Sequence, residues 1–162
     1  MKSTHINRRR FLRTTTATAA GLSLPCLIPS HVLAGPERSG ANELLNVAVI
    51  GCGGRARCVV NTCREVPTIR IVAACDCELP RAEQFVKDLS GGAKWGAYQD
   101  FRKMIEKEKL DGVMIETTTH ARAWIVIQAM QAGLDTYIEK PMCLTIAEGR
   151  AMVNAARKFN RV

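Results

Sequence analysis

The stretch VAVIGCGGRA (47–56) constrains the fold more than any other part of the chain. An apolar run ends at Gly51, and a helical pattern begins three residues later, so the glycines lie between a strand and a helix. Gly51 allows a sharp turn out of the strand. Gly53 lets a ligand approach the backbone, and Ala56 is small enough for the helix to pack on the sheet. The pattern therefore predicts a strand, a tight turn, and a helix whose first N–H groups face the turn.

The same alternation of strand and helix continues to the end of the chain. Several strands are apolar without interruption, as in parallel sheets that are covered on both faces. The pattern predicts an α/β fold with a doubly wound parallel sheet (Rossmann). The expected strands are 44–50, 69–76, a weak strand within 91–98, 111–118 and 135–140; the expected helices are 54–66, 79–90, 99–109, 120–133 and 145–159.

The segment 1–34 has the composition of an export signal. NRRRFLR (7–13) is followed by a mild apolar run at 14–29 and by the small or apolar residues VLA before Gly35. Paired arginines followed by Phe-Leu and a base resemble a twin-arginine signal, which predicts an exported, periplasmic protein. A plain secretory signal is the alternative, and an uncleaved signal would leave a membrane anchor. We divide the chain into a signal peptide (1–34), a linker (35–43) and a doubly wound α/β domain (44–162).

The positive charge of the chain is concentrated in this signal. The formal net charge is +8, but the segment 1–34 holds five bases and no acid. The segment 35–162 holds 18 basic and 15 acidic groups, a net +3, with no basic stripe among aromatic residues. We therefore expect no nucleic-acid binding. The cysteines form no CxxC pair and lack histidines at ligand spacing, so we expect no metal site and mostly buried thiols.

The glycine turn and an acid further along the chain predict a dinucleotide site. Asp76 directly follows the second strand, where the ribose-binding acid of such folds lies. A carboxylate there favours NAD over NADP, although Arg81 is close enough to soften that preference. The alternatives are a tight turn without a ligand, a helix cap at Asp76, or the similar loop of S-adenosylmethionine methyltransferases. The candidate cofactor residues of this half are Gly51, Gly53, Gly54, Arg55, Ala56 and Asp76.

Polar residues also follow the fourth and fifth strands. TTTH (117–120) ends one, and YIEKPM (137–142) ends the other with two opposite charges and a proline. In a doubly wound sheet ligands lie across the carboxyl ends of the strands, so Glu139 and Lys140 can face that crevice. Pro141 would fix the bend that aims them, and a cis peptide bond is one way to do so.

Taken together, these stretches resemble the glucose–fructose oxidoreductase/inositol dehydrogenase (Gfo/Idh/MocA) family. The resemblance covers 44–160 and depends on VAVIGCGGRA, CD at 75–76, DFRKMIE (100–106) and AMQAGLDTYIEKPMCLT (129–145). It implies an NAD(P)-dependent oxidoreductase that acts on a sugar or polyol by hydride transfer. By resemblance, Lys140 contacts substrate and supports proton transfer, and the cofactor residues of this half are Thr117, Thr118, His120, Glu139 and Lys140.

Some residues depart from the family pattern. Thr118 and Thr119 replace a proline and an Asn or Asp, and Arg122 stands where the family has a later histidine. Glu116 replaces a small apolar residue. His120 can be either a ligand contact or a residue that only begins the helix, and both alternatives stay open. Lys140 can be either a catalytic group or a residue whose contacts only close the end of the strand, and both alternatives stay open as well.

Length is the largest departure from the family. Its members carry a second α/β domain that supplies most of the substrate pocket, whereas this chain stops at FNRV (159–162), where a sixth strand is expected to begin. We therefore expect NAD binding without turnover by the chain alone, and a tendency to self-associate through the open edge of the sheet. The alternatives are a non-catalytic NAD-binding module and one half of a two-chain enzyme.

Overall fold

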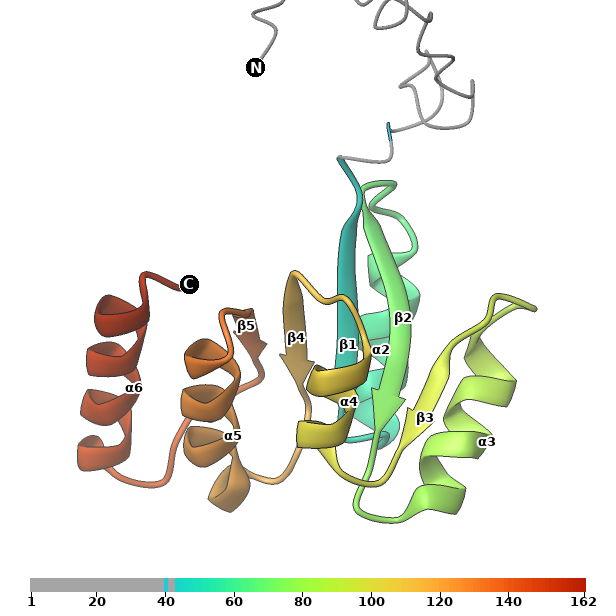
Figure 1. Cartoon of the computed structure of the whole chain (residues 1–162). Coiled ribbons are helices and arrows are strands. Elements are labelled where there is room, and N and C mark those ends of the chain that lie inside the picture. The colour runs from blue at the N-terminus through green and yellow to red at the C-terminus, as the bar shows by residue number, and fades with distance from the viewer. Residues whose placement is uncertain (1–39, 41–42) are drawn as a thin grey trace, which may run out of the picture.

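A computed structural model describes residue 40 and residues 43–162. Five parallel strands form one sheet in the order β3-β2-β1-β4-β5, with the strand order reversing beside β1 (Figure 1). This is the predicted doubly wound arrangement. The strands are β1 (Leu45–Ile50), β2 (Ile69–Cys75), β3 (Gly96–Tyr98), β4 (Gly112–Ile115) and β5 (Asp135–Ile138).

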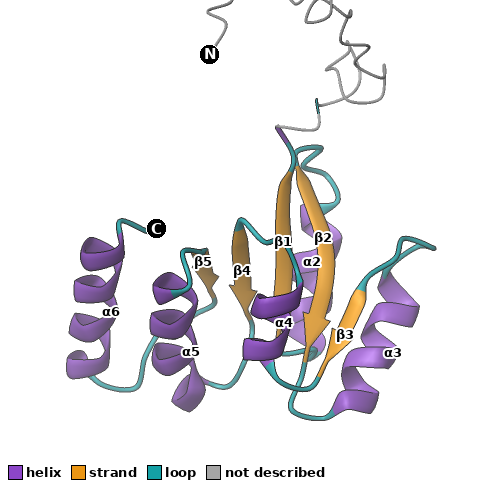
Figure 2. Ribbon diagram, viewed as in Figure 1, coloured by secondary structure: helices purple, strands orange, loops and turns teal. Residues whose placement is uncertain are grey.

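Helices cover both faces of the sheet (Figure 2). Alternate strand residues point to opposite faces: Val47 and Val49 belong to the core cluster that includes α2 and α3, whereas Ala48 and Ile50 belong to the cluster that includes α4, α5 and α6. Apolar burial on both sides explains why the strand sequences are continuously apolar. The helices are α2 (Gly54–Cys63), α3 (Leu79–Leu89), α4 (Phe101–Lys107), α5 (Thr119–Gln131) and α6 (Ile146–Phe159).

Several ends of these elements follow local sequence signals. Thr145 and Glu148 form the capping box that begins α6. Gly133 follows α5 with φ +87°, a conformation that glycine adopts without strain. The fourth and fifth strands are shorter than predicted, because β4 ends at Ile115 and β5 at Ile138. The polar residues expected at their ends are therefore in loops just beyond the sheet.

The last residues lie beside β5. After α6 the chain turns at Asn160, which has φ 51°. The N–H of Thr136 then donates to the carbonyl of Val162 at 2.7 Å, and the N–H of Val162 donates to the Asp135 carboxylate at 2.9 Å. Val162 thus pairs with the outer edge of β5, at the position where a sixth strand was expected to start.

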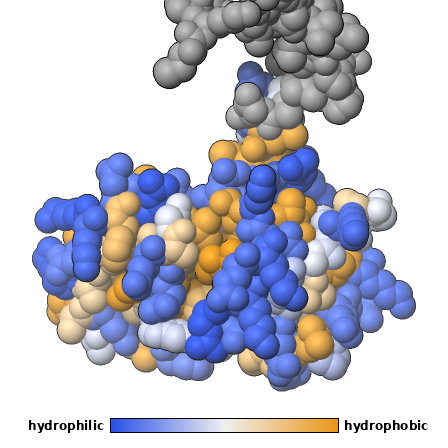
Figure 3. All heavy atoms as spheres, viewed as in Figure 1, coloured by the Kyte–Doolittle hydropathy of each residue, from blue (hydrophilic) through white to orange (hydrophobic). Residues whose placement is uncertain are grey.

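The face shown in Figure 3 is mostly hydrophilic, with apolar side chains showing at the start of β1 and over β4. Leu45 at the start of β1 is half exposed. None of the helices in the described part of the chain is long and apolar enough to cross a membrane.

The cysteines depart from the sequence prediction. Cys52 and Cys75 are buried, but Cys58 and Cys77 are exposed, so it was wrong that most cysteines are buried. Cys58 is on α2 and lines an open groove, and Cys77 lies in the loop after the end of β2 at Cys75. Within residues 43–162, histidine, cysteine and carboxylate side chains form no cluster that could hold a metal ion.

Candidate cofactor site at the carboxyl edge of the sheet

Gly51 joins β1 to the neighbouring strand. It has φ +96°, and its N–H donates to the carbonyl of Cys75 at 2.8 Å. A Cβ at this position would lie 2.8 Å from the carbonyl carbon of Glu116 and 2.9 Å from the nitrogen of Thr117. Gly51 is therefore required both for its backbone conformation and because the end of β4 passes so close.

Gly53 has a different environment. It precedes α2 with φ −81°, and a Cβ there would meet nothing within 4 Å. The same is true of Gly54, the first residue of α2. No side chain caps α2, so its first N–H groups are free to bind an anion. This open, uncapped helix start leaves room for a dinucleotide pyrophosphate, and the contact of Gly53 and Gly54 with one stays a prediction. Ala56 is fully buried against the sheet.

Asp76 holds the glycine turn from the end of β2. Its side chain is 7% exposed and accepts hydrogen bonds from the N–H of Cys52 at 2.9 Å and of Glu78 at 3.0 Å. The N-cap position of α3 is Glu78, whose side chain makes no capping hydrogen bond, so Asp76 is not the N-cap of α3. The oxygen that accepts from Glu78 also accepts from the Cys77 thiol at 3.6 Å, whereas the oxygen that accepts from Cys52 has a second lone pair, so Asp76 can still accept from a ribose hydroxyl while it supports the turn.

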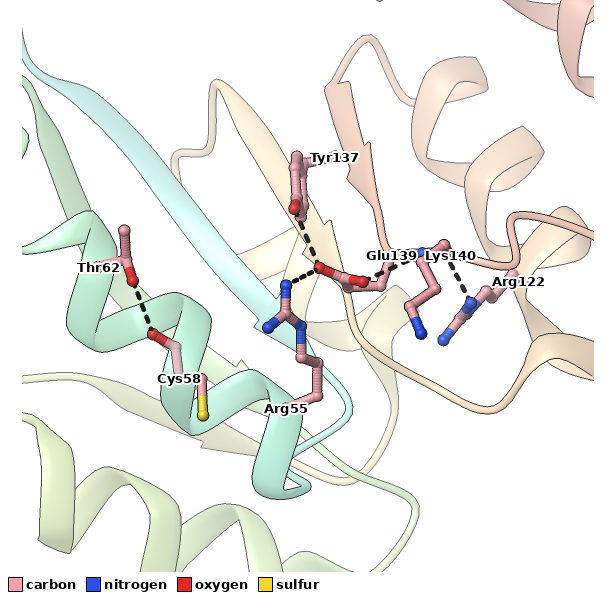
Figure 4. Close-up of polar contacts among 7 residues, drawn as sticks. All are labelled: Arg55, Cys58, Thr62, Arg122, Tyr137, Glu139 and Lys140. Carbon is pink, nitrogen blue, oxygen red and sulfur yellow. Dashed lines mark hydrogen bonds and ion pairs between the residues drawn. The ribbon is translucent and has the colours of Figure 1, made fainter.

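Arg55 turns toward the end of β5. Its guanidinium forms an ion pair with Glu139 across 84 residues of sequence, and the Tyr137 hydroxyl donates to the same carboxylate at 3.2 Å (Figure 4). The hydrogen bond from Arg55 holds the pKa of Glu139 below its ordinary value. Arg55 was predicted as a cofactor residue; its side chain is still 61% exposed in this pair, and its contact with a cofactor stays a prediction.

Lys140 is exposed just after this buried carboxylate, and the peptide bond between Lys140 and Pro141 is cis. Glu139 itself is 6% exposed, so the negative charge of this pair of neighbours is buried while the positive charge of Lys140 is exposed. The Glu139 carboxylate also accepts from the N–H of Lys140 at 3.2 Å. Glu139 is thereby fixed inside the protein, and Lys140 is presented at its surface.

Arg122 is a buried residue of this edge to which the sequence pattern assigned no role. Its side chain is on the first turns of α5 and is 7% exposed. It donates to the carbonyls of Thr117 at 2.8 Å and Glu139 at 2.7 Å, and also to that of Pro141. The departure from the family pattern marked Arg122 as unusual, but only the folded chain shows these three contacts.

Glu116 has the least favourable polar environment of the described residues. Its side chain is 9% exposed, and neither carboxylate oxygen has a hydrogen-bond partner; the same holds for the Thr117 hydroxyl. Burial, and then the nearby charge of Glu139, raise the pKa of Glu116 above its ordinary value. A neutral, protonated acid is the form that this surrounding favours.

The remaining predicted residues and thiols lie at the same edge. Thr118 is the exposed N-cap of α5, and His120 is exposed on its first turn. Their contacts with a cofactor stay predictions. Burial raises the pKa of Cys52 and of Cys75 to about 12, so neither is a thiolate at neutral pH.

An apolar groove lies next to this edge, on the face of β4 and β5 that is on the same side of the sheet as α2. Its volume is about 550 Å³, and Arg55 stands among its lining residues. On this face α2 and α3 pack over β1 and β2, while the helices that follow β4 and β5 lie on the other face. The apolar part of the lining includes Leu45, Val47, Val59, Ile69, Met114 and Tyr137.

Comparison with protein families matches residues 45–162 to GFO_IDH_MocA, an oxidoreductase family with an NAD-binding Rossmann fold. D-apiose dehydrogenase of Paraburkholderia graminis is 35% identical over 114 residues, which are 68% of this chain and 29% of that protein. A glycosyl hydrolase family 109 protein of Shewanella pealeana is 29% identical over 96% of this chain and 38% of its own length. The chain thus spans about a third of the curated relatives it matches.

Solved structures show the same fold. The myo-inositol 2-dehydrogenase of Lactobacillus plantarum superposes with a TM-score of 0.66 at 26% identity, over 74% of this chain and 35% of that one. The WlbA dehydrogenase of Chromobacterium violaceum, in complex with NADH and UDP-GlcNAcA, gives a TM-score of 0.68 at 21% identity. The superposition covers 76% of this chain and 35% of that one.

Proposed function

This chain belongs to the Gfo/Idh/MocA oxidoreductase family and carries its NAD-binding Rossmann fold, and we propose on this basis that it is the cofactor-holding part of an exported enzyme that transfers hydride between NAD and a sugar or polyol. NAD supplies the hydride acceptor or donor when bound. The observation that carries the proposal is the open space at Gly53, at the uncapped start of α2. An anion such as a pyrophosphate would be bound there by backbone N–H groups.

The proposed substrate class follows from the relatives and from Lys140. Two relatives are named D-apiose dehydrogenase and inositol 2-dehydrogenase, and both names denote polyhydroxylated substrates. Lys140 is exposed at the carboxyl edge, where it can exchange a proton with a substrate hydroxyl. We assign it that role, with Glu139 and Arg122 fixing the backbone on either side of it.

Turnover would require a further domain. Hydride transfer needs cofactor and substrate at contact distance, and this chain spans only about a third of the relatives' length. The exposed apolar groove on the α2 side supports packing against such a domain. We therefore propose that the 162-residue chain alone binds NAD and does not turn over polyols. A non-catalytic module would bind NAD equally but would gain no turnover when the further domain is supplied.

The cofactor proposal is tested by calorimetric titration of the chain with NAD⁺ and with NADP⁺. We expect saturable NAD⁺ binding and weaker NADP⁺ binding, because the Asp76 carboxylate repels a 2′-phosphate. Asp76→Asn keeps an oxygen for the Cys52 N–H and removes the charge, so it should narrow the difference between the two cofactors. Glu78→Gln, a loss of charge close by in the same loop, is the matched control and should leave the ratio unchanged. Equal affinities in the unmodified chain would refute the preference.

A second candidate function is cleavage of a glycosidic bond. Relatives that match over 96% of this chain are named glycosyl hydrolase family 109 proteins. The two functions differ in their products. Release of nitrophenol from a nitrophenyl glycoside by the chain with its further domain would favour hydrolysis, and net NADH formation from a free polyol would favour dehydrogenation.

Export through the twin-arginine route is part of the proposal and depends on residues 1–34, which lie outside the described residues. Replacing both Arg8 and Arg9 with lysine keeps the charge but removes the paired guanidinium groups that this route reads. Cell fractionation should then find the chain in the cytoplasm rather than the periplasm. Unchanged export of the double variant would indicate a plain secretory signal.

A further inference from the structure

Arg122 is a buried cation without a carboxylate partner among the described residues. Its hydrogen bonds go to three backbone carbonyls, those of Thr117, Glu139 and Pro141. These acceptors are 5, 17 and 19 residues away in sequence, and they come from the ends of β4 and β5 and the turn after β5. One side chain thus joins three backbone segments at the carboxyl edge.

The chemistry of arginine explains why this residue can be buried here. A buried charge is costly unless polar groups compensate it, and carbonyls beyond a strand end have lost their partners in the sheet. The guanidinium stays charged and presents several N–H donors in a fixed plane, so it can satisfy carbonyls that point from different directions. A lysine in this place has a single nitrogen, and a histidine has only two. Neither reproduces this set of contacts.

The contacts of Arg122 fall on both sides of Lys140. The carbonyl before Lys140 belongs to Glu139, and the carbonyl of Pro141 follows it, while the Lys140 N–H donates to the Glu139 carboxylate. Arg55 holds that carboxylate from the opposite side (Figure 4). The backbone around Lys140 is therefore fixed by side chains, although the Lys140 side chain itself is exposed.

With a ribose at Asp76 after β2 and the pyrophosphate at the start of α2, the other end of a bound NAD would lie toward β4 and β5, which are on the opposite side of β1 from β2. We propose that Arg122 is a positioning residue for Lys140: by holding the carbonyls of Thr117, Glu139 and Pro141 together, it aims the Lys140 side chain at that end of the cofactor. The consequence for the cofactor rests on the proposed function. The joining of the three backbone segments does not, so the two can be tested separately.

The first experiment measures amide hydrogen exchange by mass spectrometry in the 162-residue chain and in Arg122→Lys. Lysine keeps the charge but cannot hold all three carbonyls, so peptides covering 116–119 and 138–143 should exchange at least about tenfold faster. Arg150→Lys, at an exposed position on α6, is the matched control and should exchange like the unmodified chain. Free guanidinium ion at non-denaturing concentration should restore slow exchange to Arg122→Ala. Unchanged exchange at 138–143 in Arg122→Lys would overturn the proposal.

The second experiment tests the aim of Lys140. The chain is acetylated with acetic anhydride with and without NADH, and modification of Lys140 is compared with that of exposed Lys103. NADH should protect Lys140 in the unmodified chain and in Arg150→Lys but not in Arg122→Lys, while Arg122→Lys still binds NADH. Equal protection of Lys140 in Arg122→Lys would overturn the positioning role. Loss of NADH binding together with a general loss of stability would reduce Arg122 to a structural residue. Absence of NADH binding by the unmodified chain would refute the proposed function, and the exchange experiment would still decide whether Arg122 holds the three segments.

Discussion

The two halves of the carboxyl edge are built in different ways. In the half made by β1, β2 and α2, the key groups are backbone N–H groups at a glycine turn, supported by one carboxylate from the next strand. In the half made by the ends of β4 and β5, the support comes from helix side chains: Arg55 on α2 pairs with the Glu139 carboxylate, and Arg122 on α5 donates to three backbone carbonyls. A site that binds an invariant phosphate can be made from backbone, whereas a site that must aim one side chain requires support from several elements.

The halves also differ in how completely their polar groups are satisfied. Asp76 in the first half accepts hydrogen bonds on both carboxylate oxygens, from Cys52 and Glu78. Glu116 in the second half accepts on neither, although the two residues are similarly buried. The first half therefore gains stability from its acid, and the second half loses it. Substitutions on each side can test this contrast.

The largest effect is expected where the two halves touch, at Gly51. Alanine there would combine a left-handed backbone conformation with a Cβ only 2.8 Å from the carbonyl carbon of Glu116. We expect Gly51→Ala to lower the free energy of unfolding by about 2–4 kcal/mol, measured by urea denaturation.

Gly53→Ala is the matched control, because its Cβ would meet no protein atom within 4 Å. Stability should change by no more than about 1 kcal/mol, but NADH affinity should fall, since the methyl group fills the space where a phosphate approaches the backbone. If Gly53→Ala destabilised the chain as much as Gly51→Ala, the assignment of separate roles to the two glycines would be wrong.

The next effect concerns the unsatisfied acid. Leucine is similar in size to glutamate, and Glu116→Leu removes a buried carboxyl group that has no hydrogen-bond partner. We therefore expect Glu116→Leu to raise the free energy of unfolding by about 1–3 kcal/mol at pH 8. Because the pKa of Glu116 is raised in the folded chain, ionisation costs stability as pH rises from the ordinary value of 4.5 through the raised value. The gain should therefore shrink at low pH. Thermal unfolding of the unmodified chain and of Glu116→Leu at several pH values measures how this gain in stability depends on pH. Glu116→Gln is the control that removes only the charge. A loss of stability in Glu116→Leu at pH 8 would contradict this account.

The smallest effect is expected for the ion pair that joins the halves. Arg55 is 61% exposed, so its pair with Glu139 is partly screened by solvent and salt. The pKa of Glu139 is lowered, so the pair contributes stability above the ordinary glutamate pKa of 4.5 and loses that contribution as pH falls through the lowered value. A double-mutant cycle with Arg55→Gln and Glu139→Gln should show a small coupling at pH 7 that disappears at acid pH and weakens in high salt. A coupling that persisted at pH 2 would exclude an ionic origin.

Local patterns in the sequence were enough to predict much of the fold. The order of strands and helices, the turn at Gly51, the capping box at Thr145 and the end of α5 at Gly133 each depend on residues a few positions apart. The ends of β4 and β5 were predicted too late in the chain, because polar residues just beyond a strand share its extended backbone. Tertiary packing sets where those strands stop.

The sequence alone predicted a doubly wound α/β domain with a glycine turn open to an anion. It could do so because the periodicity of apolar residues and the position of a glycine act locally on the backbone. The same residues placed Glu139, Lys140 and Thr117 at one edge, since parallel strands bring their carboxyl ends together. The folded chain was needed to show that Arg55 pairs with Glu139, that Arg122 holds three carbonyls, and that Glu116 is left without a partner. Those outcomes depend on which side chains meet across as many as 84 residues, and that is fixed by packing of whole elements and not by any short pattern.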